Sequence, residues 1–544
     1  MNAREQIELV NNLKQTLEAA CGSGQVRLFE THISFVILTG TFAYKIKKAV
    51  ALDFLDFSTL EKRHFYCLEE LRLNQRFSGD LYLEVLPIAG TIGNPHIGAP
   101  GAPIEYAVKM REFPQACLAD NLVRKGALLP SHAISMAQRL AESHKSAARL
   151  DPACEYGSSA MLSRKMAATF EGLRLLLDGE NDLRDVSWLS DWCARELAAK
   201  SPVIEQRRNG GFVRECHGDL HLGNIALLDG QAALFDCIEF DDALRCIDVM
   251  SDMAFVAMDL HAHGRRDLCY LFLNTYLELT GDHDGVAVLR LYLVQRALIR
   301  CHVALLRRRQ AARNGAGDDA GEAPDYLHLA MTWAQPTYPF LLLMHGLSGC
   351  GKTRVSDALK QTLAALRIRS DVERKRLPQQ IAAAESPSSG VQSLYDAAHT
   401  KVTYGRLLQL AQSLLEEGYN VIVDACSLLV QQRRPFMALA ASLDAPFAIL
   451  DVCADEHLLR ARIMRRAAEA VDASEADVGV LEHQILAQEN FEPDEGACVV
   501  AYESRNGNVI DKKDPAYDTL ERRLMPQADA ASTTSSWNLP LTLD

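Results

Sequence analysis

The spacing of hydrophobic residues divides the chain into two parts of different character. Near the start of the first part, residues 32–40 and 41–48 are rich in β-branched and aromatic side chains around a Thr-Gly-Thr turn, which predicts a β-hairpin. Residues 58–77 follow with leucines and aromatic residues at helical spacing. Two more strand-like runs, 80–90 and 104–113, complete a small predicted sheet with one long helix.

The rest of the first part is predicted to be mostly helical. Hydrophobic residues recur at helical spacing from about 115 to 335, interrupted by one β-rich segment at 213–240. A charged, Gly- and Ala-rich tract at 307–325 has a composition typical of a mobile connection. We place the domain boundary near residue 335, after this tract.

Beyond residue 335, continuous apolar runs alternate with helix-length segments. This alternation predicts a doubly wound parallel sheet, because strands that are buried on both faces are apolar throughout. The predicted strands are 340–346, 366–373, 420–426 and 447–454. We therefore expect an α+β domain over 1–335, an α/β domain over 336–515 and, from its small polar residues, a disordered tail over 516–544.

Composition narrows the class of protein. The chain has 544 residues, 48% of them hydrophobic and 24% charged, with a formal net charge of −14, which disfavours binding to nucleic acid or an anionic membrane. No apolar run reaches the ~18 residues that a membrane-spanning helix needs, and the polar start does not resemble a signal peptide. The 14 cysteines form no CxxC pairs or His/Cys clusters, so we expect free thiols in a cytoplasmic protein.

The most specific motif follows the first predicted strand of the second domain. Residues 345–357 read HGLSGCGKTRVSD and contain the spacing G-x-x-x-x-G-K-T of a phosphate-binding loop. Such a loop turns successive backbone N–H groups toward one phosphate at a helix N-terminus. Lys352 is expected to reach the β- and γ-phosphates of ATP, and the Thr353 hydroxyl to ligate Mg²⁺. The predicted nucleotide-binding residues are Gly346, Leu347, Ser348, Gly349, Cys350, Gly351, Lys352 and Thr353.

Three further features of this domain suit phosphoryl transfer. Asp371 and Arg374 follow the second strand, where a carboxylate can accept the proton of an acceptor hydroxyl and an arginine can hold the substrate. Asp424 ends the third strand, where it can hold Mg²⁺ through water or contact the acceptor. An arginine-rich segment can form a mobile lid, with Arg460, Arg462, Arg465 and Arg466 as candidates. The ordinary alternatives are a helix N-cap, a strand-end polar residue and a solvated helix face.

The first domain carries a second kinase-type motif. The run CHGDLHLGNI contains the spacing H-x-D-x-x-x-x-N of a catalytic loop, and LFDCIEF follows it. Asp219 is expected to accept the proton of a hydroxyl, Asn224 to close back on the loop and ligate Mg²⁺, and Asp236 to bridge the metal to the β- and γ-phosphates. The alternative is a polar loop in a β-hairpin. His221 is interpreted as structural rather than as a metal ligand.

A lysine of the predicted hairpin belongs to the same site. Lys45 stands in an A-x-K pattern typical of a nucleotide-holding strand, and Lys47 has the same facing by the two-residue period, so both stay open. Glu69 or Glu70 on the following helix can pair with that lysine, and we favour Glu70. The hairpin has no G-x-G-x-x-G pattern, only Gly40, so the loop over the phosphates is expected to be short.

Both domains resemble kinase families. GLSGCGKT, SDVER, NVIVDA and the arginine-rich segment are similar to the small P-loop kinases of the polynucleotide kinase, zeta-toxin and gluconate kinase group. CHGDLHLGNI and LFDCIEF resemble the aminoglycoside phosphotransferase and choline kinase group, which has a two-lobed protein-kinase-like fold. With TGTFAYKIKK and LDFSTLEKRHFYCLEELRLN, the chain except its tail resembles a bacterial fusion of these domains, often labelled an AAA-type ATPase. The resemblance implies a hinge at 107–113 and phosphorylation of a hydroxyl.

These motifs predict a cytoplasmic bifunctional kinase that uses ATP and Mg²⁺, with one site per domain. Each site is expected to transfer the γ-phosphoryl group to a hydroxyl of a small-molecule acceptor. One alternative is a nucleotide-binding switch or scaffold whose first domain binds without transfer. Another is a nucleic-acid end kinase, which the basic run RIRSDVERKR at 367–376 favours. Neither the acceptors nor the oligomeric state follows from these motifs.

Overall fold

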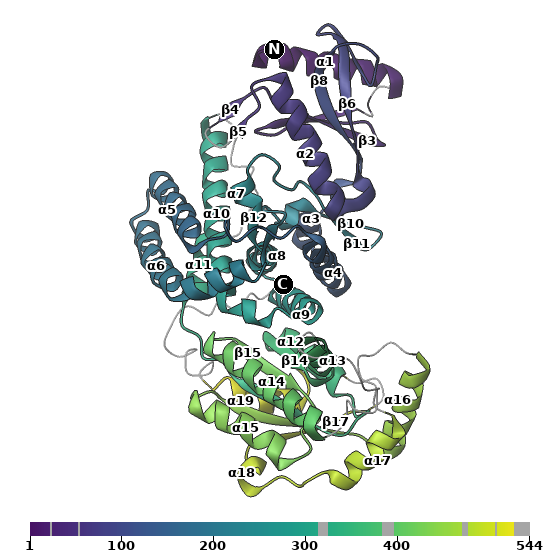
Figure 1. Ribbon diagram of the computed structural model, residues 1–544, viewed down its shortest axis with the longest axis vertical. Coiled ribbons are helices and arrows are strands. Elements are labelled where there is room, and N and C mark those ends of the chain that lie inside the picture. The colour runs from purple at the N-terminus through teal and green to yellow at the C-terminus, as the bar shows by residue number, and fades with distance from the viewer. Residues whose placement is uncertain are drawn as a thin grey trace. The chain divides into compact units, whose positions relative to one another are not determined.

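The chain forms two structural units, each with its own sheet (Figure 1). The computed structural model describes residues 1–526 except 22–23, 25, 53–54, 314–324, 383–396, 470–476 and 506–508. The first unit comprises Met1–Arg265 and Val288–Ala334, and the second comprises Arg266–Ala287 and Gln335–Asp544. Among the described helices, none is long and apolar enough to cross a membrane.

The first unit begins with a six-stranded antiparallel sheet in the order β1-β2-β3-β8-β6-β7. Its strands are β1 (Arg27–Glu30), β2 (Ser34–Leu38), β3 (Phe42–Lys47), β6 (Tyr82–Thr91), β7 (Asn94–Ile97) and β8 (Pro103–Arg111). The predicted hairpin consists of β2 and β3. Because side chains alternate along β3, Tyr44 and Ile46 pack beneath α1 (Ala3–Cys21), while Lys45 and Lys47 face α2 (Leu60–Ser78).

The rest of the first unit is mainly helical and is centred on α8 (Val249–Ala262). Every residue of α8 from Val249 to Leu260 is buried, so it lies inside the helical layer. The β-rich segment predicted at 213–240 contains a short strand and a hairpin with an Asp-Gly turn. The elements are α3 (Ala119–Arg124), α4 (Pro130–Ser146), α5 (Ser159–Leu176), α6 (Glu180–Asn209), α7 (Asp242–Arg245), α10 (Val286–Arg313), α11 (Tyr326–Ala334), β4 (Ala51–Leu52), β5 (Leu55–Asp56), β9 (Val213–Glu215), β10 (Ile225–Leu228), β11 (Gln231–Leu234) and β12 (Cys246–Asp248).

The second unit contains a five-stranded parallel sheet in the order β14-β15-β13-β16-β17. The strands are β13 (Leu341–His345), β14 (Ala365–Arg369), β15 (Asn420–Asp424), β16 (Phe447–Cys453) and β17 (Val499–Glu503). The helices are α12 (Lys352–Thr362), α13 (Ser370–Ala382), α14 (Ala397–Glu416), α15 (Val430–Ser442), α16 (Glu456–Glu469), α17 (Val478–Ala487), α18 (Pro493–Gly496) and α19 (Pro515–Leu524). The predicted fold class, an α+β domain followed by a doubly wound parallel sheet, is confirmed.

Two boundaries differ from the sequence prediction. The strand predicted at 366–373 ends at Arg369, because Ser370 already begins α13. The tail predicted to be disordered from 516 instead starts as α19, with Asp514 as its N-cap and Pro515 in its first turn. Residues 527–544, the rest of that tail, lie outside the described residues. The tract at 307–325 continues α10 up to Arg313, and 314–324 are likewise outside the description.

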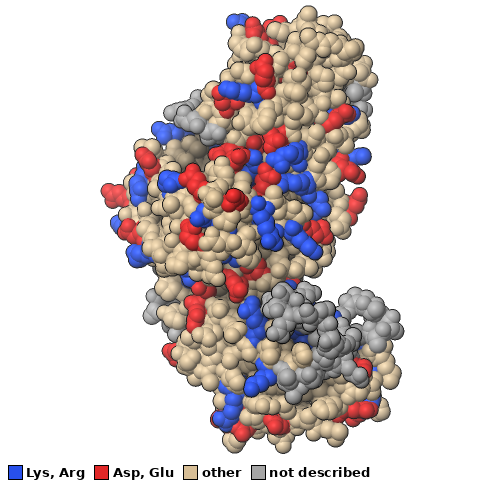
Figure 2. Space-filling view, in the orientation of Figure 1, with Lys and Arg blue, Asp and Glu red and all other residues tan. Residues whose placement is uncertain are grey.

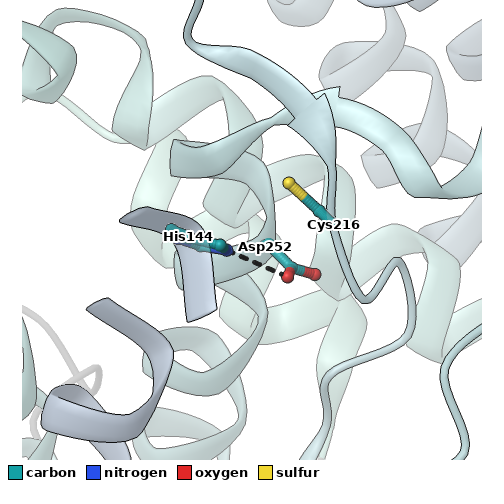
Figure 3. A group of neighbouring side chains, drawn as sticks. All are labelled: His144, Cys216 and Asp252. Atoms are coloured by element: carbon teal, nitrogen blue, oxygen red, sulfur yellow. Dashed lines mark hydrogen bonds and ion pairs between the residues drawn. The ribbon is translucent and has the colours of Figure 1, made fainter. Parts of the chain in front are cut away.

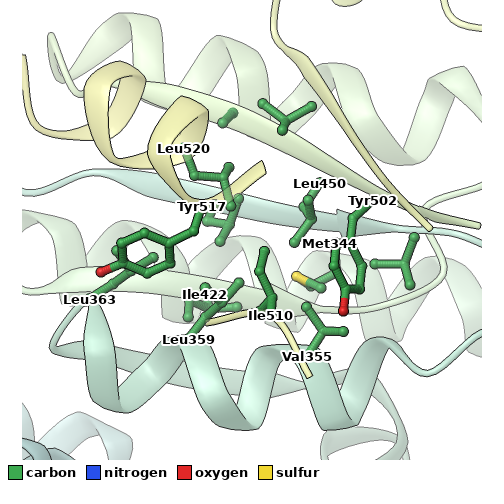
Figure 4. Close-up of a cluster of buried hydrophobic side chains, with 14 of the residues drawn as sticks. Met344, Val355, Leu359, Leu363, Ile422, Leu450, Tyr502, Ile510, Tyr517 and Leu520 are labelled. Carbon is green, nitrogen blue, oxygen red and sulfur yellow. The ribbon is translucent and has the colours of Figure 1, made fainter. Parts of the chain in front are cut away.

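Helix α19 completes the core of the second unit. Tyr517, Leu520 and Leu524 repeat on one helical face and are buried. Figure 4 shows side chains of α19 meeting those of α12 and of the central strands. This packing explains the wrong prediction: a short apolar face, and not the overall polar composition, determines the structure here.

Helix α9 (Arg266–Thr280) belongs to the second unit, although the chain before and after it belongs to the first. The side-chain amide of Asn274 donates to the carbonyl of Ala365 (2.9 Å) and accepts the N–H of Arg367 (2.7 Å). Both partners are backbone groups of β14, which is an edge strand of the sheet. Unpaired edge groups are costly when buried and promote association when exposed. The side chain of Asn274 therefore pairs with one C=O and one N–H at the edge of β14, as a neighbouring strand would.

We expect Leu520→Ala to destabilise the second unit by ~2–5 kcal/mol, because it opens a cavity between α19 and the sheet. Hydrogen exchange of the β17 amides measures this change. Glu521→Ala, on the exposed side of the same helix, is the matched control. Equal protection in both variants would contradict the core role of α19.

The buried His283, in the turn that follows α9, makes the second unit sensitive to acid. Burial, followed by the charges of Arg376 and Arg406, lowers the pKa of His283 to about 4. A histidine in the unfolded chain titrates near pH 6.5, so this stabilisation is complete above about pH 6.5 and is lost as the pH falls toward 4. We expect the unfolding temperature of the second unit to fall between about pH 7.5 and 5, and His283→Gln to weaken that dependence. Calorimetric unfolding tests this, and an unchanged pH dependence in the variant would refute it.

Candidate active sites

The predicted catalytic loop of the first unit is a closed turn between β9 and β10. Asn224 Nδ2 donates to the carbonyl oxygen of Asp219 at 2.8 Å and lies 3.3 Å from its Oδ2. The N–H of Phe235 donates to the carbonyl of Asn224 at 3.0 Å, which joins the loop to the residue before Asp236. Asn224 is buried, whereas 40% of the Asp219 side chain is exposed. The loop thus presents the accessible carboxylate of Asp219 on a turn that hydrogen bonds fix in place.

A buried carboxylate behind the loop fixes its backbone (Figure 3). The two oxygens of Asp252 accept the N–H groups of His217 (3.0 Å) and Gly218 (2.9 Å). His144 Nε2 lies 3.2 Å from the same carboxylate. Burial acts to raise the pKa of Asp252, but its hydrogen bond with His144 and the nearby histidines lower it to about 2. The carboxylate is therefore ionised and anchors the start of the loop.

The same carboxylate belongs to a group of metal-ligand types. His144, Cys216 and Asp252 bring their ligand atoms within 4.8 Å of one another. Both Asp252 oxygens already accept backbone hydrogen bonds. Burial raises the pKa of the Cys216 thiol well above its usual value, and the thiol donates to the carbonyl of Ile247 at 3.5 Å. Because a metal binds the thiolate, we interpret this group as support for the loop and not as a metal centre.

Both candidate lysines of β3 converge on one glutamate. Lys45 Nζ and Lys47 Nζ each lie 2.7 Å from a different oxygen of Glu70. Lys45 also contacts Asp236 Oδ1 at 2.5 Å, and the fully buried Lys47 contacts Glu239. Lys45 is therefore the lysine that meets the predicted metal-binding carboxylate. Lys47 contacts the other oxygen of Glu70 from the buried side of the Lys45–Glu70 pair.

The charges of this network lower the pKa of Glu70 and Asp236, whereas burial raises the pKa of Glu239. Burial acts to lower the pKa of Lys45, but Asp236 and Glu70 raise it well above its usual value. Burial likewise acts to raise the pKa of Asp236, and Lys45 lowers it overall. Glu69, the other glutamate considered, instead pairs with Arg72 at 2.8 Å on a more exposed side of α2.

The donor groups at this point suit a magnesium ion. Asp236 has a φ of 64°, and its N–H donates to the Tyr82 hydroxyl at 3.1 Å. Its side chain remains 45% exposed beside Lys45. Because the amide nitrogen of Asn224 bonds to Asp219, the amide oxygen is directed elsewhere. Carboxylate and amide oxygens are the ligands that Mg²⁺ prefers.

The turn above this site is tight, as its single glycine predicts. The N–H of Thr39 donates to the carbonyl of Phe42 at 2.9 Å, which closes the β2–β3 hairpin. The N–H of Gly40 donates to Glu112 Oε2 at 2.6 Å. A protein carboxylate thus occupies the Gly40 amide.

The phosphate-binding loop of the second unit requires its glycines. Gly346, Gly349 and Gly351 have φ values of 134°, 84° and 102°, which other residues rarely adopt. A side chain at Gly346 would lie 2.4 Å from the carbonyl oxygen of Val452. The loop therefore leads directly from β13 into the N-terminus of α12.

Two side chains bond to the backbone of this loop. Lys352 Nζ donates to the carbonyls of Gly346 (2.8 Å) and Leu347 (2.9 Å), so the amine lies inside the loop. The N–H of Ser348 donates to the side chain of Gln484, on α17, at 2.8 Å. Gln484 was not predicted from the sequence, and nothing in its spacing singles it out.

The carboxylates predicted for this site lie at the ends of two neighbouring strands. Asp371 lies 3.6 Å from Arg374, the spacing that one helical turn gives. Asp424 is buried and accepts the Ser356 hydroxyl of α12 at 3.0 Å. Burial acts to lower the pKa of Lys352, but Cys350 and Cys426, followed by Asp424 and Asp371, raise it. Thr353, in the first turn of α12, and Asp424 supply hydroxyl and carboxylate oxygens of the kind that Mg²⁺ binds.

One arginine of the predicted lid segment contacts the loop. Arg462 donates to the carbonyl of Cys350 at 3.1 Å and lies 3.3 Å from the Ser504 hydroxyl. Arg460 pairs with Glu456 and Glu482 at the surface, which matches the solvated-face alternative. Arg465 is exposed, and the side chain of Arg466 is outside the described residues.

Several site residues were missed by sequence reasoning. Glu239 and Asp252 both lie in the acidic stretch that follows the catalytic loop, where their number obscured their separate roles. Glu239 stands three residues after Asp236, a spacing that could have indicated it. The contacts of Gln484 and of α9 join distant segments, and no local pattern marks them.

Comparison with known proteins gives one family match and one set of relatives. Residues 341–491 match a family described as an AAA domain, which agrees with the P-loop domain expected in this region. The uncharacterized protein Rv2004c of Mycobacterium tuberculosis is 30% identical over 449 residues, which cover 82% of this chain and 87% of that protein. The uncharacterized protein Mb2027c of Mycobacterium bovis matches to the same extent.

Solved structures with some likeness fall into two groups. A choline kinase from Cryptosporidium parvum covers 61% of this chain and 93% of its own, at 12% identity and a TM-score of 0.35. A gluconokinase from Sinorhizobium meliloti covers 36% of this chain and 96% of its own, at 18% identity and a TM-score of 0.23.

We expect Lys47→Met to destabilise the first unit more than Lys45→Met. Lys47 is fully buried between Glu70 and Glu239, so its removal leaves buried charge uncompensated, at a cost of ~3–5 kcal/mol. Lys45 borders the accessible Asp236, where water can replace part of the lost contact. Calorimetric unfolding of the full chain compares the two. A larger loss for Lys45→Met would contradict this division of roles.

Proposed function

The chain belongs to the same family as the Mycobacterium tuberculosis protein Rv2004c, and we propose that it is a bifunctional ATP-dependent kinase. Each unit transfers the γ-phosphoryl group of ATP to a hydroxyl of a small-molecule acceptor. The main support is the connected set in the first unit, in which Lys45 meets Asp236 and Asn224 closes on Asp219. The second unit adds the glycine loop and Lys352.

In the first unit, Asp219 is the base that receives the proton of the acceptor hydroxyl. Its carboxylate is accessible, and Asn224 fixes its loop. Lys45 holds Asp236 and neutralises phosphate charge, while Glu70 holds Lys45. Bound between Asp236 and Asn224, Mg²⁺ would supply charge neutralisation at the phosphates.

In the second unit, the loop amides and Lys352 bind the phosphates. Lys352 Nζ leaves the loop carbonyls of Gly346 and Leu347 when phosphate oxygens replace them as its partners. Asp371 receives the acceptor proton, and Arg374 holds the acceptor or its phosphate. Thr353 and Asp424 would hold Mg²⁺, which supplies the same neutralisation in this unit.

A nucleotide-binding switch is the second candidate, because one observation favours it. The Gly40 amide is taken by Glu112, so the first unit offers few backbone donors to phosphate. In this reading the first unit binds nucleotide without transfer, and the second unit remains an active kinase. The accessible carboxylate of Asp219 argues against a switch, because a module that only binds nucleotide needs no general base.

A nucleic-acid end kinase receives less support. The arginines of the basic run at 367–376 pair with acidic side chains: Arg367 and Arg369 pair with Glu278 of α9, and Arg376 pairs with Glu373. Acidic and basic side chains are interspersed on the face in Figure 2. With a net charge of −14, the chain suits small acceptors better than a phosphate backbone.

We also propose that the protein works in the cytoplasm, where thiols stay reduced. The cysteines of the described part of the chain are free, and most are buried. A reducing compartment is where such unpaired cysteines are ordinary.

Separate losses are expected when each site is removed. Asp219→Asn should abolish one phosphorylated product and Lys352→Ala another, each falling by at least ~100-fold, because each variant removes a group needed in only one unit. The measurement is ADP release with a library of sugars, nucleosides, amino alcohols and aminoglycosides, with products identified by mass spectrometry.

Asp229→Asn is the control for that experiment. Asp229 lies in the hairpin turn with a φ of 49°, which asparagine also adopts, and it belongs to neither site. It should leave both products unchanged. ATP turnover without any phosphorylated acceptor, or one substitution that removes both products from a folded protein, would overturn two independent kinase sites.

A further inference from the structure

Three arginines on one face of α10 surround the predicted base of the first unit. Arg296, Arg300 and Arg307 are four and seven residues apart, spacings that return to the same side of a helix. Arg296 is buried and donates to the carbonyls of Gly218 and Ser251, both at 3.1 Å. This face of α10 therefore begins behind the catalytic loop.

Arg300 is connected to the catalytic loop through two side chains. Its Nε and Nη2 each lie 3.4 Å from the Tyr326 hydroxyl. That hydroxyl donates to Asp259 Oδ1 at 2.9 Å, and Asp259 Oδ2 accepts the N–H of Leu222 at 2.9 Å. Both oxygens of Asp259 are thus engaged, and Leu222 stands only three residues after Asp219. The guanidinium group of Arg300 is therefore fixed beside the loop by the tyrosine.

Arg307 and His221 complete the charged surroundings of Asp219. His221 Nε2 lies 3.6 Å from Asp219 Oδ2. Burial lowers the pKa of His221, so its ring is neutral near pH 7. Burial and the charge of Arg300 lower the pKa of Arg307, whereas Asp219 raises it, so these three charges lie within electrostatic reach of one another. The positive charge beside the base comes from arginines and not from the imidazole.

Two of these guanidinium groups have no carboxylate partner in the described part of the chain. Arg300 is half-buried and Arg307 is more exposed, and neither forms an ion pair with a described residue. Asp219 is itself 40% exposed. A ligand that brings a hydroxyl to this base therefore meets two guanidinium groups whose charge is not yet paired.

The nucleotide side of the site uses a different cation. Lys45 contacts Asp236, the carboxylate expected to hold the metal at the phosphates. The charges that raise the pKa of Arg300 are those of Asp259 and Asp219 instead. Because the acceptor hydroxyl must approach Asp219, the arginines are placed for the acceptor and not for the phosphates of ATP.

We propose that the acceptor of the first unit carries an anionic group, a carboxylate or a phosphate ester, which Arg300 and Arg307 bind. The inference rests on the proposed function: the acceptor oxygen bonds to the γ-phosphorus, its proton passes to Asp219 and ADP leaves. Guanidinium groups bind both kinds of anion through paired N–H donors. The same charges repel a cationic acceptor such as an amino alcohol or an aminoglycoside.

The first test is the selectivity of binding, measured by titration calorimetry on the full chain with ADP and Mg²⁺ present to occupy the nucleotide sites. The probes share one three-carbon skeleton: glycerol, glycerate, glycerol phosphate and serinol, which is cationic. We expect the tighter of the two anions to bind at least ~10-fold more strongly than glycerol or serinol, because hydrogen bonds to charged groups contribute that much. Comparing the two anions distinguishes a carboxylate from a phosphate.

Two neighbouring arginines provide a matched pair of variants. Arg307→Gln and Arg308→Gln remove the same charge, but Arg308 lies on another side of α10, near the Cys301 thiol. Arg307→Gln should weaken binding of the tighter anion by ~10-fold or more and leave glycerol binding unchanged, whereas Arg308→Gln should change neither. A purely structural role would weaken binding of charged and neutral probes alike.

A second pair of variants separates charge from shape at Arg300. Arg300→Lys keeps the positive charge and should retain more of the anion affinity than Arg300→Gln. Equal binding of all four probes, or an equal effect of Arg307→Gln and Arg308→Gln, would overturn the inference.

Turnover of ATP with the same probes separates this failure from failure of the proposed function. A product that disappears in Asp219→Asn belongs to the first unit. If that product came preferentially from glycerol or serinol, the kinase would be confirmed and the anionic acceptor refuted. Binding of an anion that depends on Arg307, with no product lost in Asp219→Asn, would refute the proposed kinase activity of this unit and leave the anion site in place.

Discussion

Buried charge is the constraint around which the first unit is organised. Two lysines of β3 and the carboxylates of Glu70 and Glu239 share one region with little access to water, and the more exposed Asp236 contacts Lys45 at its border. Each charge is tolerated only because an opposite charge touches it, so the sheet, α2 and the segment after β11 must be in register together. Asp236, whose side chain is 45% exposed, stands at the outer edge of this network.

The second unit solves a related problem with backbone groups. In its glycine loop the N–H of Ser348 donates to Gln484, and Lys352 satisfies the loop carbonyls of Gly346 and Leu347. Arginines on β14 add positive charge close to Asp424, and a carboxylate from α9 offsets it. Both units therefore place a carboxylate behind cations of the candidate site: Glu70 behind Lys45, and Glu278 behind Arg367 and Arg369.

Local pattern predicted most elements and the motif residues, because strand and helix periods are short-range. It left Lys45 and Lys47 open, since both face the same way, and only their partners in space distinguish them. The sequence prediction placed the end of β14 too late. It also interpreted α19 as a disordered tail, because only three spaced apolar residues of that helix enter the core. The contacts of Asn274 and Glu278 join positions some 90 residues apart, and no period connects them. The functional roles of the site residues stay predictions until the variants are measured.

Two separate segments of the chain, 266–287 and 335–544, form the second unit. The order in which they are synthesised has a consequence for folding. Residues 266–287 leave the ribosome well before the strand that they cover, so the polar face of α9 must wait for its partner. After synthesis, the edge of β14 stays unpaired until the side chain of Asn274 docks against it. Unpaired strand edges can pair wrongly with other chains. A gene cut near codon 335 would make that exposure permanent. The second unit therefore needs residues 266–287 as well as those after residue 335.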